Sequence, residues 1–374
     1  MVQAAPLRVG IDAHVVGRRQ TGNETYVVEL ASALARRSDI DPVAYVDGDT
    51  AWPRADAPRL GRFRWRSRYL RIPLELPVRA RQDRISVLHV QYVAPPVSPV
   101  PMVVTVHDLS FIDVPGDLPR AMVWRMRATV GLAVRQAAVV LAVSEFTRGR
   151  LIEHYGLEPE RVVVTPNGVD PRWRPLAVAE REARLAAAGL SDLPARFVLA
   201  IGAQVPRKNL ERLVRAVAAV RADGQPDIGL VIAGPAGKAT EALEAQMARS
   251  DAAGWVRLVG YVPHDALVAL VGTAEVVAYP SRYEGFGLPV LEAMACGAIV
   301  VAGDRSSIPE VAGDAAILVD PDDDEALSAG LRAALADTDL RARLAEAGPR
   351  RAATFDWDQC AAATVEGYRR ALDA

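Results

Sequence analysis

Cysteine and long apolar runs are scarce in this chain of 374 residues, and each shortage argues against a class of protein. The two cysteines, Cys296 and Cys360, lie far apart and neither belongs to a CxxC pair, which argues against a disulfide framework and a zinc site. No uninterrupted apolar run approaches the roughly 18 residues of a membrane-spanning helix. The N-terminus lacks the charged region and long apolar core of a signal peptide, so we expect a cytoplasmic protein.

Charge of one sign is not in excess either. The net charge is −2 at pH 7, so the chain as a whole shows no bias towards nucleic acid. Only Lys208 and Lys238 are lysines among 44 basic residues, which draws attention to any lysine beside a predicted site. The GxGxxG fingerprint is absent after the first strand, where Gly10, Gly17 and Gly22 have the wrong spacing, and this argues against a dehydrogenase.

Positive charge is nevertheless concentrated in one segment. Residues Arg54 to Arg84 contain ten arginines against three acids, with Phe63, Trp65 and Tyr69 between them. The segment fits a solvated face with arginine stems lying along the surface, an electropositive acceptor cleft, or contact with anionic lipid. The lipid interpretation would place the protein peripherally at the inner face of the membrane.

Two halves of the chain repeat one order of elements, a buried apolar strand followed by a loop and a helix. The first half opens with a strand at 7–11, a polar loop at 12–25 and a helix at 26–36, and the second half restarts with a strand at 197–201. Such alternation predicts an α/β fold of two doubly wound domains with parallel sheets. A turn cluster, Pro166 to Asp170, marks the boundary near residue 172.

The stretch Tyr279–Gly297, YPSRYEGFGLPVLEAMACG, combines a strand end, a glycine loop and a short helix. Gly285 and Gly287 lie in the loop, and Pro289 and the terminal glycine mark the two ends of the helix. Such a loop presents backbone N–H groups and the positive end of a helix dipole. The stretch therefore predicts a site for an anion such as a diphosphate.

Charged residues near this loop extend the prediction to a sugar nucleotide. Glu284 and Glu292 bracket the loop and suit sugar hydroxyls rather than phosphates. Arg207 and Lys208 follow the strand at 197–201 and suit a diphosphate. His107 ends a strand in the first half, where ligands of open α/β sheets bind.

Six motifs then give the chain a family resemblance. They are HDLSF (107–111), PNGVD (166–170), PRKNL (206–210), VGYVP (259–263), PSRYEGFGLPVLEAMACG (280–297) and SSIPEVAGDAAILVDPDD (306–323). The chain resembles the family 4 glycosyltransferases, which retain configuration at the transferred sugar and have the GT-B fold of two Rossmann-like domains facing across a cleft. The resemblance implies an acceptor-side domain at 1–172, a donor-binding domain at 173–356 and a helix at 357–374 that crosses back onto the first domain.

The resemblance also implies roles for single residues of the donor site. Glu292 would bind the ribose, and Glu284 would contact hydroxyls of the transferred sugar. Arg207 and Lys208 would hold the departing diphosphate, and His107 would lie at the sugar. The remaining donor-binding positions implied are Gly22, Val262, Phe286, Gly287, Leu288 and Pro289.

The resemblance further implies a hexosyltransferase that needs no metal and no cofactor. The acidic turn Asp320 to Asp324 after the last strand is interpreted as solvated and not as a metal site, in agreement with this. The donor would be GDP-mannose or, next, a UDP-sugar, and the acceptor a hydroxyl of a glycan, a lipid-linked sugar or a small metabolite.

Two departures from the family pattern leave contacts open. Gly202-Ala203 replaces the Gly-Thr or Gly-Arg pair of many relatives, and TGNETY replaces a doubled glycine motif in the first loop. Two alternative functions also stay open, a nucleotide-sugar epimerase of the same fold and a non-catalytic protein that binds sugar nucleotides. An epimerase would convert donor without any acceptor.

Overall fold

Buried, β-branched runs in the first half of the chain form a parallel sheet, sheet A. Its strand order is β3-β2-β1-β4-β5-β6-β7, and all the pairs are parallel. The strands are β1 (Leu7–Asp12), β2 (Ile40–Asp47), β3 (Arg59–Phe63), β4 (Val87–Gln91), β5 (Met102–Val106), β6 (Val139–Ala142) and β7 (Val162–Val164). Parallel strands need a crossover between neighbours, so helices cover both faces of the sheet.

The second half forms a parallel sheet of its own, sheet B. Its strand order is β10-β9-β8-β11-β12-β13. The strands are β8 (Arg196–Ile201), β9 (Ile228–Ala233), β10 (Val256–Gly260), β11 (Val276–Tyr279), β12 (Val300–Gly303) and β13 (Ile317–Val319). In both sheets the order reverses direction beside the first strand, which confirms the predicted pair of doubly wound, Rossmann-like domains.

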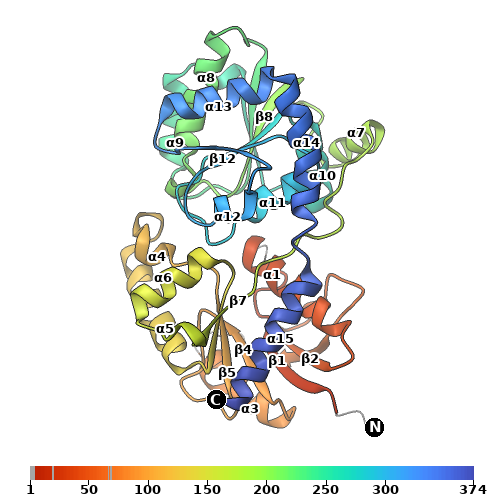
Figure 1. Ribbon diagram of the computed structural model, residues 1–374, viewed down its shortest axis with the longest axis vertical. Coiled ribbons are helices and arrows are strands. Elements are labelled where there is room, and N and C mark those ends of the chain that lie inside the picture. The colour runs from red at the N-terminus through yellow and green to blue at the C-terminus, as the bar shows by residue number, and fades with distance from the viewer. Residues whose placement is uncertain (1–4, 19–20, 66, 68–69) are drawn as a thin grey trace. The chain divides into compact units, whose positions relative to one another are not determined.

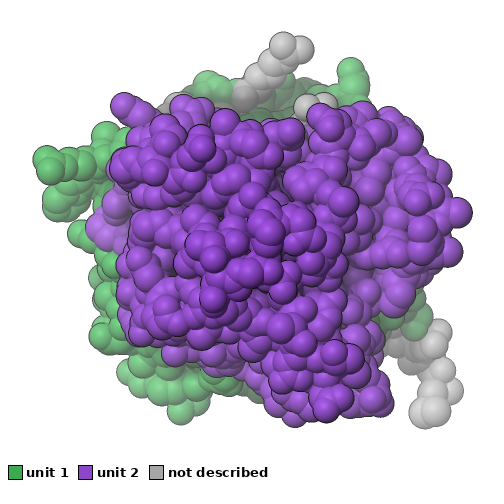
Figure 2. Space-filling model, turned by 90° about the horizontal axis from the view of Figure 1, so that it is seen from above, with its two compact units in different colours: residues 1–113, 119–168, 355–374 green, residues 114–118, 169–354 purple. Residues whose placement is uncertain are grey.

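A computed structural model describes the chain except for residues 1–4, 19–20, 66 and 68–69, and the chain forms two units (Figures 1 and 2). Unit 1 holds residues 1–113, 119–168 and 355–374, and unit 2 holds residues 114–118 and 169–354. The last helix therefore returns to the first unit. A short segment from the first half of the chain, 114–118, packs with the second.

Amphipathic helices cover the sheets. Those of unit 1 are α1 (Thr21–Ala35), the π-helical η1 (Arg71–Glu75), α3 (Leu76–Gln82), α4 (Ser110–Asp113), α5 (Arg120–Gln136), α6 (Glu145–Tyr155), the short η3 (Pro159–Arg161) and α15 (Trp357–Asp373). Those of unit 2 are η2 (Pro115–Asp117), α7 (Val178–Ala187), η4 (Pro206–Lys208), α8 (Leu210–Ala222), α9 (Thr240–Arg249), η5 (Ala252–Gly254), α10 (His264–Thr273), α11 (Leu288–Ala295), α12 (Ile308–Ala312), α13 (Asp324–Ala336) and α14 (Thr338–Ala352).

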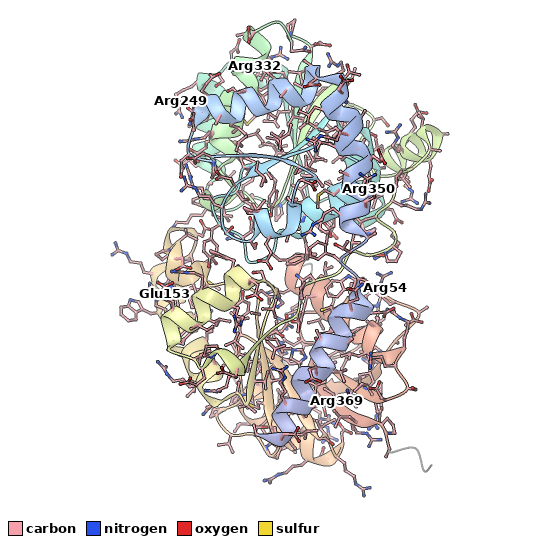
Figure 3. The ribbon with its side chains drawn as sticks, in the orientation of Figure 1. Arg54, Glu153, Arg249, Arg332, Arg350 and Arg369 are labelled. Carbon is pink, nitrogen blue, oxygen red and sulfur yellow. The ribbon has the colours of Figure 1, made fainter. Side chains whose placement is uncertain are left out.

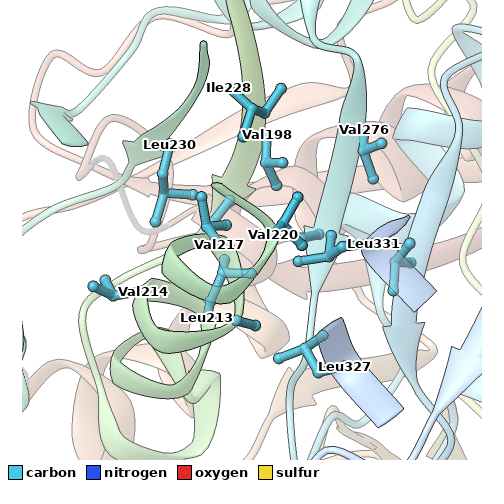
Figure 4. Packing of buried hydrophobic residues seen from close by; sticks show 14 of the residues in the cluster. Val198, Leu213, Val214, Val217, Val220, Ile228, Leu230, Val276, Leu327 and Leu331 are labelled. Atoms are coloured by element: carbon cyan, nitrogen blue, oxygen red, sulfur yellow. The ribbon is translucent and has the colours of Figure 1, made fainter. Parts of the chain in front are cut away.

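The core of unit 2 shows how a helix is fixed to its sheet (Figure 4). Leu213 and Val217 of α8 point towards Val198 and Leu230 of sheet B, and all four side chains are buried. Leucines of α13 close the same cluster. This packing orients the loops that leave the carboxyl ends of the strands.

One local prediction about unit 1 is wrong, and one strand of this unit was not predicted. Helix α1 begins at Thr21 rather than at residue 26, because Glu24 lies in its first turn and accepts a hydrogen bond from the Gly17 backbone N–H at 2.7 Å. A carboxylate there also complements the helix dipole. The stretch TGNETY therefore opens the helix and does not form a loop. The arginine-rich segment, for which no strand was predicted, contributes the edge strand β3.

Candidate active site

The glycine loop after β11 enters helix α11 with the geometry that its sequence predicts. Gly287 precedes the first helical residue with φ at 99°, and Gly297 follows the helix with φ at 72°. Both angles lie in the left-handed region, which a side chain with a Cβ disfavours. Leu288 and Pro289 occupy the first helical positions and are partly exposed. The N–H groups of the first turn therefore end next to the loop that carries Glu284.

Lys208 and Glu284 form the centre of the site. The Lys208 ammonium lies 2.7 Å from a carboxylate oxygen of Glu284, donates to the Tyr279 hydroxyl and lies 4.3 Å from the centroid of the Tyr279 ring. Each of the two charged residues is less than one tenth exposed. Two predicted site residues that lie far apart in the sequence thus meet at the carboxyl end of sheet B.

Burial and charge oppose each other at Glu284. Burial raises the pKa of its carboxyl group, but the charges of Lys208 and Arg207 and the hydrogen bond from Lys208 outweigh that effect, so the pKa is lowered. Burial also raises the pKa of Tyr279 well above its ordinary value, with the Glu284 charge adding to the effect. At neutral pH the centre therefore holds an ionised Glu284 carboxylate beside a neutral Tyr279 phenol.

Neighbouring loops hold this centre by its backbone. The Ser306 hydroxyl accepts a hydrogen bond from the Glu284 N–H at 2.9 Å, and the Ser307 hydroxyl donates to the Glu284 carbonyl at 3.0 Å. Asn209 adopts a left-handed conformation and donates to the Pro321 carbonyl at 2.6 Å. Two serines of the loop after β12 thus hold the backbone of Glu284 in place.

Arg207 is held by a carboxylate that the sequence did not single out. Asp117, on η2, accepts from the Arg207 guanidinium at 2.7 Å and from its backbone N–H at 3.1 Å. The Asp117 side chain is 3% exposed. Segment 114–118 belongs to unit 2 by packing, so this ion pair is a feature of that unit. Its carboxylate fixes both the backbone and the side chain of Arg207.

Glycines make room for Lys208. A Cβ at Gly202 would lie 3.0 Å from the Lys208 side chain, and a Cβ at Gly234 would lie 1.9 Å from the Gly202 carbonyl oxygen. The loops after β8 and β9 therefore touch at two glycines. The space beside Gly202 is occupied by the Lys208 side chain.

The other predicted donor residues of unit 2 lie on elements around this centre. Val262 is buried just beyond β10, and Phe286 is buried in the glycine loop. Glu292 lies on α11 and is partly exposed. These residues share one unit with the Lys208–Glu284 pair, but their predicted contacts with a donor remain predictions.

In unit 1, His107 lies directly after β5 in an aromatic setting. Its ring packs edge-on against Tyr26, with centroids 4.7 Å apart, and lies 5.5 Å from the ring of Tyr92. Its Nε2 lies 2.6 Å from Oε1 of Gln91. Burial, with a smaller contribution from His89, lowers the pKa of His107 to about 3, so the imidazole is neutral at pH 7. Because an amide oxygen only accepts, Nε2 carries the proton and Nδ1 is the acceptor.

Gly22 occupies an open position in unit 1. It is the second residue of α1, and a Cβ placed on it would meet no atom within 4 Å. Space within the structure therefore does not require glycine here, and the predicted approach to a ligand remains a prediction.

Four of the ten arginines in the segment Arg54–Arg84 form ion pairs within unit 1. Arg54 pairs with Glu29, Arg59 with Asp83, Arg71 with Asp47 and Arg79 with Glu75. Arg71 is fully buried. Arg66, Arg68 and Tyr69 lie outside the described residues. The four ion pairs neutralise the charge at these positions, but Arg59 is still half exposed, and Arg62, Arg64, Arg81 and Arg84 are exposed, as a solvated face requires.

Comparison with known proteins decides the family. A family model described as "Glycosyltransferase Family 4" matches residues 21–173, and one described as "Glycosyl transferases group 1" matches residues 184–351. The chain is 33% identical to O-antigen chain mannosyltransferase B of Escherichia coli over 272 residues, which cover 71% of this chain and 70% of that protein. The chain belongs to the family 4 glycosyltransferases. The predicted family is confirmed, and with it a hexosyltransferase of the GT-B fold.

Two further relatives show the spread of this family. The glycosyltransferase is 33% identical to MMP alpha-(1->4)-mannosyltransferase of Mycolicibacterium hassiacum, over 73% of this chain and 66% of that protein. It is 34% identical to D-inositol 3-phosphate glycosyltransferase of Salinispora arenicola, over 74% of this chain and 64% of that protein.

Solved structures support the fold. Sucrose-phosphate synthase from Thermosynechococcus elongatus superposes with a TM-score of 0.78 at 20% identity, over 97% of this chain and 98% of that one. Anabaena HepE in complex with UDP and glucose gives a TM-score of 0.76 at 20% identity, over 96% and 98%. At such identities the likeness concerns the fold alone.

Proposed function

We propose that this glycosyltransferase moves a hexose from a nucleotide diphosphate sugar to a hydroxyl acceptor, with retention of configuration and without a metal. The observation that carries the proposal is the buried Lys208–Glu284 pair, with Arg207 bonded into the same unit and the N-terminus of α11 adjoining the loop. Two cations and a helix dipole suit a diphosphate, and a carboxylate suits sugar hydroxyls. The donor domain is 173–356 and the acceptor-side domain 1–172.

GDP-mannose is the preferred donor in this proposal, because two relatives more than 30% identical are named mannosyltransferases. A UDP-sugar comes next, because HepE binds UDP, but at an identity that supports the fold alone. The acceptor is a glycan, a lipid-linked sugar or a small metabolite.

The proposed chemistry depends on stabilising the leaving group. Charge develops on the diphosphate as the glycosidic bond breaks, and Arg207, Lys208 and the first-turn N–H groups of α11 would stabilise it. Glu292 would orient the ribose and Glu284 the hexose, while the neutral His107 would accept a sugar hydroxyl at Nδ1. We assign no enzyme nucleophile, so the acceptor would attack on the face that the diphosphate leaves. A glycosyl adduct trapped on Glu284 would contradict this step.

A panel of GDP-, UDP-, ADP- and dTDP-sugars, without added metal, tests the donor proposal by thermal shift. Binding to the folded state raises the unfolding midpoint with ligand concentration. One nucleotide series is expected to give a saturable shift, and no shift with any donor would contradict the proposal. Incubation of the stabilising donor alone separates a transferase from an epimerase, since only the epimerase converts donor quantitatively into an isomer.

Contact with the membrane is part of the same proposal, because lipid-linked acceptors reside there. None of the described helices combines the length and apolar character that crossing a bilayer requires. The contact that we propose is peripheral, at the cytoplasmic face. The segment Arg54–Arg84 is its first candidate, although four of its arginines pair with carboxylates of unit 1.

A further inference from the structure

Helix α5 has one apolar, buried face and an unusual exposed one. Val123, Val130 and Val134 are buried against unit 1. On the opposite side Trp124 is 72% exposed and Leu132 is 47% exposed. Ala121 and Ala128 are also exposed, and spacings of three and four residues place all four on one face. The outer face of α5 thus has an apolar centre around a tryptophan.

All the charged residues of α5 itself are arginines. The helix carries Arg120, Arg125, Arg127 and Arg135 and no acidic residue. Arg127 and Arg135 bond to backbone carbonyls, at 3.4 and 3.3 Å. Among the described residues, no carboxylate pairs with Arg120, Arg127 or Arg135. Their positive charge therefore has no compensating carboxylate within the described part of the chain, in contrast to the four paired arginines of the segment 54–84.

The position of Arg120 is itself unfavourable without an anion. It is the first residue of α5, where the helix dipole is positive, and a cation there is destabilising. A negatively charged surface outside the helix would remove this cost.

Neighbouring elements extend the apolar centre. Val97, which is 74% exposed, adjoins Pro96, whose carbonyl accepts from the Gln136 side chain at the end of α5. On η1 and α3, Leu74 and Val78 are four residues apart and each 52% exposed. The crossovers β3–α3–β4 and β5–α5–β6 step in the same direction along sheet A, so right-handed connections place α3 and α5 on one face of the sheet. Helix α15 packs against α1 and lies on the other face.

We propose that this face of unit 1, centred on Trp124 and flanked by the arginines of α5, is a docking surface for an anionic lipid bilayer. Tryptophan prefers the level of the headgroups, and arginine binds lipid phosphate as a planar fork. A helix with an apolar centre and basic flanks lies in the plane of such an interface. The proposal deepens the membrane contact proposed above and assigns it chiefly to α5.

Co-sedimentation of the full chain with vesicles tests this surface without donor or turnover. The protein is expected to bind vesicles of equal parts phosphatidylglycerol and phosphatidylcholine, to bind pure phosphatidylcholine weakly, and to dissociate at high salt. Arg120→Gln/Arg127→Gln is expected to weaken binding to anionic vesicles by about fivefold for each arginine. Trp124→Ala is expected to weaken it by about tenfold.

The double variant Arg369→Gln/Arg370→Gln is the matched control. It removes the same charge from α15, on the other face of sheet A in the same unit (Figure 3). This control is expected to bind vesicles like the wild type. Unchanged thermal unfolding and donor binding would show that every variant is folded, and they separate this test from that of the donor site.

Three results would overturn the proposal. They are equal binding to neutral and anionic vesicles, wild-type binding by the α5 variants, and a concentration-dependent dimer that Trp124→Ala abolishes. The last result would assign the surface to a second copy of the chain.

Discussion

Two carboxylates determine how the basic side chains of the proposed donor site are held. Glu284 pairs with Lys208 and Asp117 pairs with Arg207, each at 2.7 Å. Because all four side chains are at least three quarters buried, each cation loses little further conformational freedom when an anion binds. The same burial makes the fold sensitive to mutation, because removing one member of a pair leaves the other charge buried without a partner and lowers the free energy of unfolding.

Lys208→Ala is expected to abolish nucleotide binding and to lower the free energy of unfolding by about 3 kcal/mol, because it leaves the Glu284 carboxylate buried without its partner. The double variant Lys208→Ala/Glu284→Gln is expected to recover much of the stability, because the neutral amide leaves no buried charge without a partner. It should not recover nucleotide binding, because the lysine is still missing. Thermal unfolding and calorimetric titration measure the two effects. Wild-type affinity in the single variant would remove Lys208 from the site.

Asp117→Ala is expected to weaken binding of a nucleoside diphosphate by about tenfold, because the Arg207 guanidinium loses the group that orients it. Asp117→Asn retains an acceptor oxygen and should lose less. The free nucleoside, which has no phosphate, should bind all three proteins equally. Tighter diphosphate binding by the alanine variant would instead show that Asp117 competes with the phosphates.

At the scale of elements, helix α11 illustrates what a local sequence can determine. Pro289 and Gly297 predict where the helix begins and ends, and both positions are confirmed. Their conformational rules are local, so no tertiary information is needed. The predicted start of α1 at residue 26 was wrong, because Thr, Gly and Asn at 21–23 are residues typical of loops. In the structure the helix extends back to Thr21, and Glu24 of its first turn accepts a hydrogen bond from the Gly17 N–H.

Gly287→Ala is expected to lower the free energy of unfolding by about 1–2 kcal/mol, because φ at 99° is strained for any residue with a Cβ. It should also weaken donor binding, since the residue sets the direction of the first turn of α11. Gly254→Ala is the control, because a Cβ there meets no atom within 4 Å. Equal effects of the two substitutions in chemical denaturation would contradict the role of Gly287.

At the scale of the molecule, the fold could be predicted but several partners within the site could not. Alternating strands and helices indicated two parallel-sheet domains, and the motifs indicated Glu284, Arg207 and Lys208. The contacts of Asp117 and Gln91 were not predicted, because a single polar residue belongs to no periodic pattern and no motif. Their partners lie far away in the sequence, and only the tertiary structure brings them together. The exposed apolar face of α5 was not predicted either, because the sequence pattern of a helix does not show whether a single tryptophan is buried or exposed.

The stability of the whole chain should depend on pH through its buried histidines. Burial lowers the pKa of His89 and of His107 to about 3, against 6.5 in an unfolded chain. Between these values the unfolded state binds protons that the native state does not, so stability falls as pH falls. Each histidine contributes up to about 1.4 kcal/mol per pH unit. His107→Gln should flatten the slope of unfolding free energy between these pKa values, and an unchanged slope would contradict the neutral, buried state of His107.

The most direct test of the central claim is a calorimetric titration of the wild type and of Glu292→Ala with GDP-mannose and UDP-glucose, without metal. Glu292 is partly exposed on α11, so its loss should leave the fold intact. We expect saturable binding of one donor by the wild type and a loss of affinity of about tenfold or more in the variant, because the ribose hydroxyls lose a charged acceptor. Wild-type affinity in Glu292→Ala, or no binding of either donor by the wild type, would contradict the claim that unit 2 is a sugar-nucleotide site of this design.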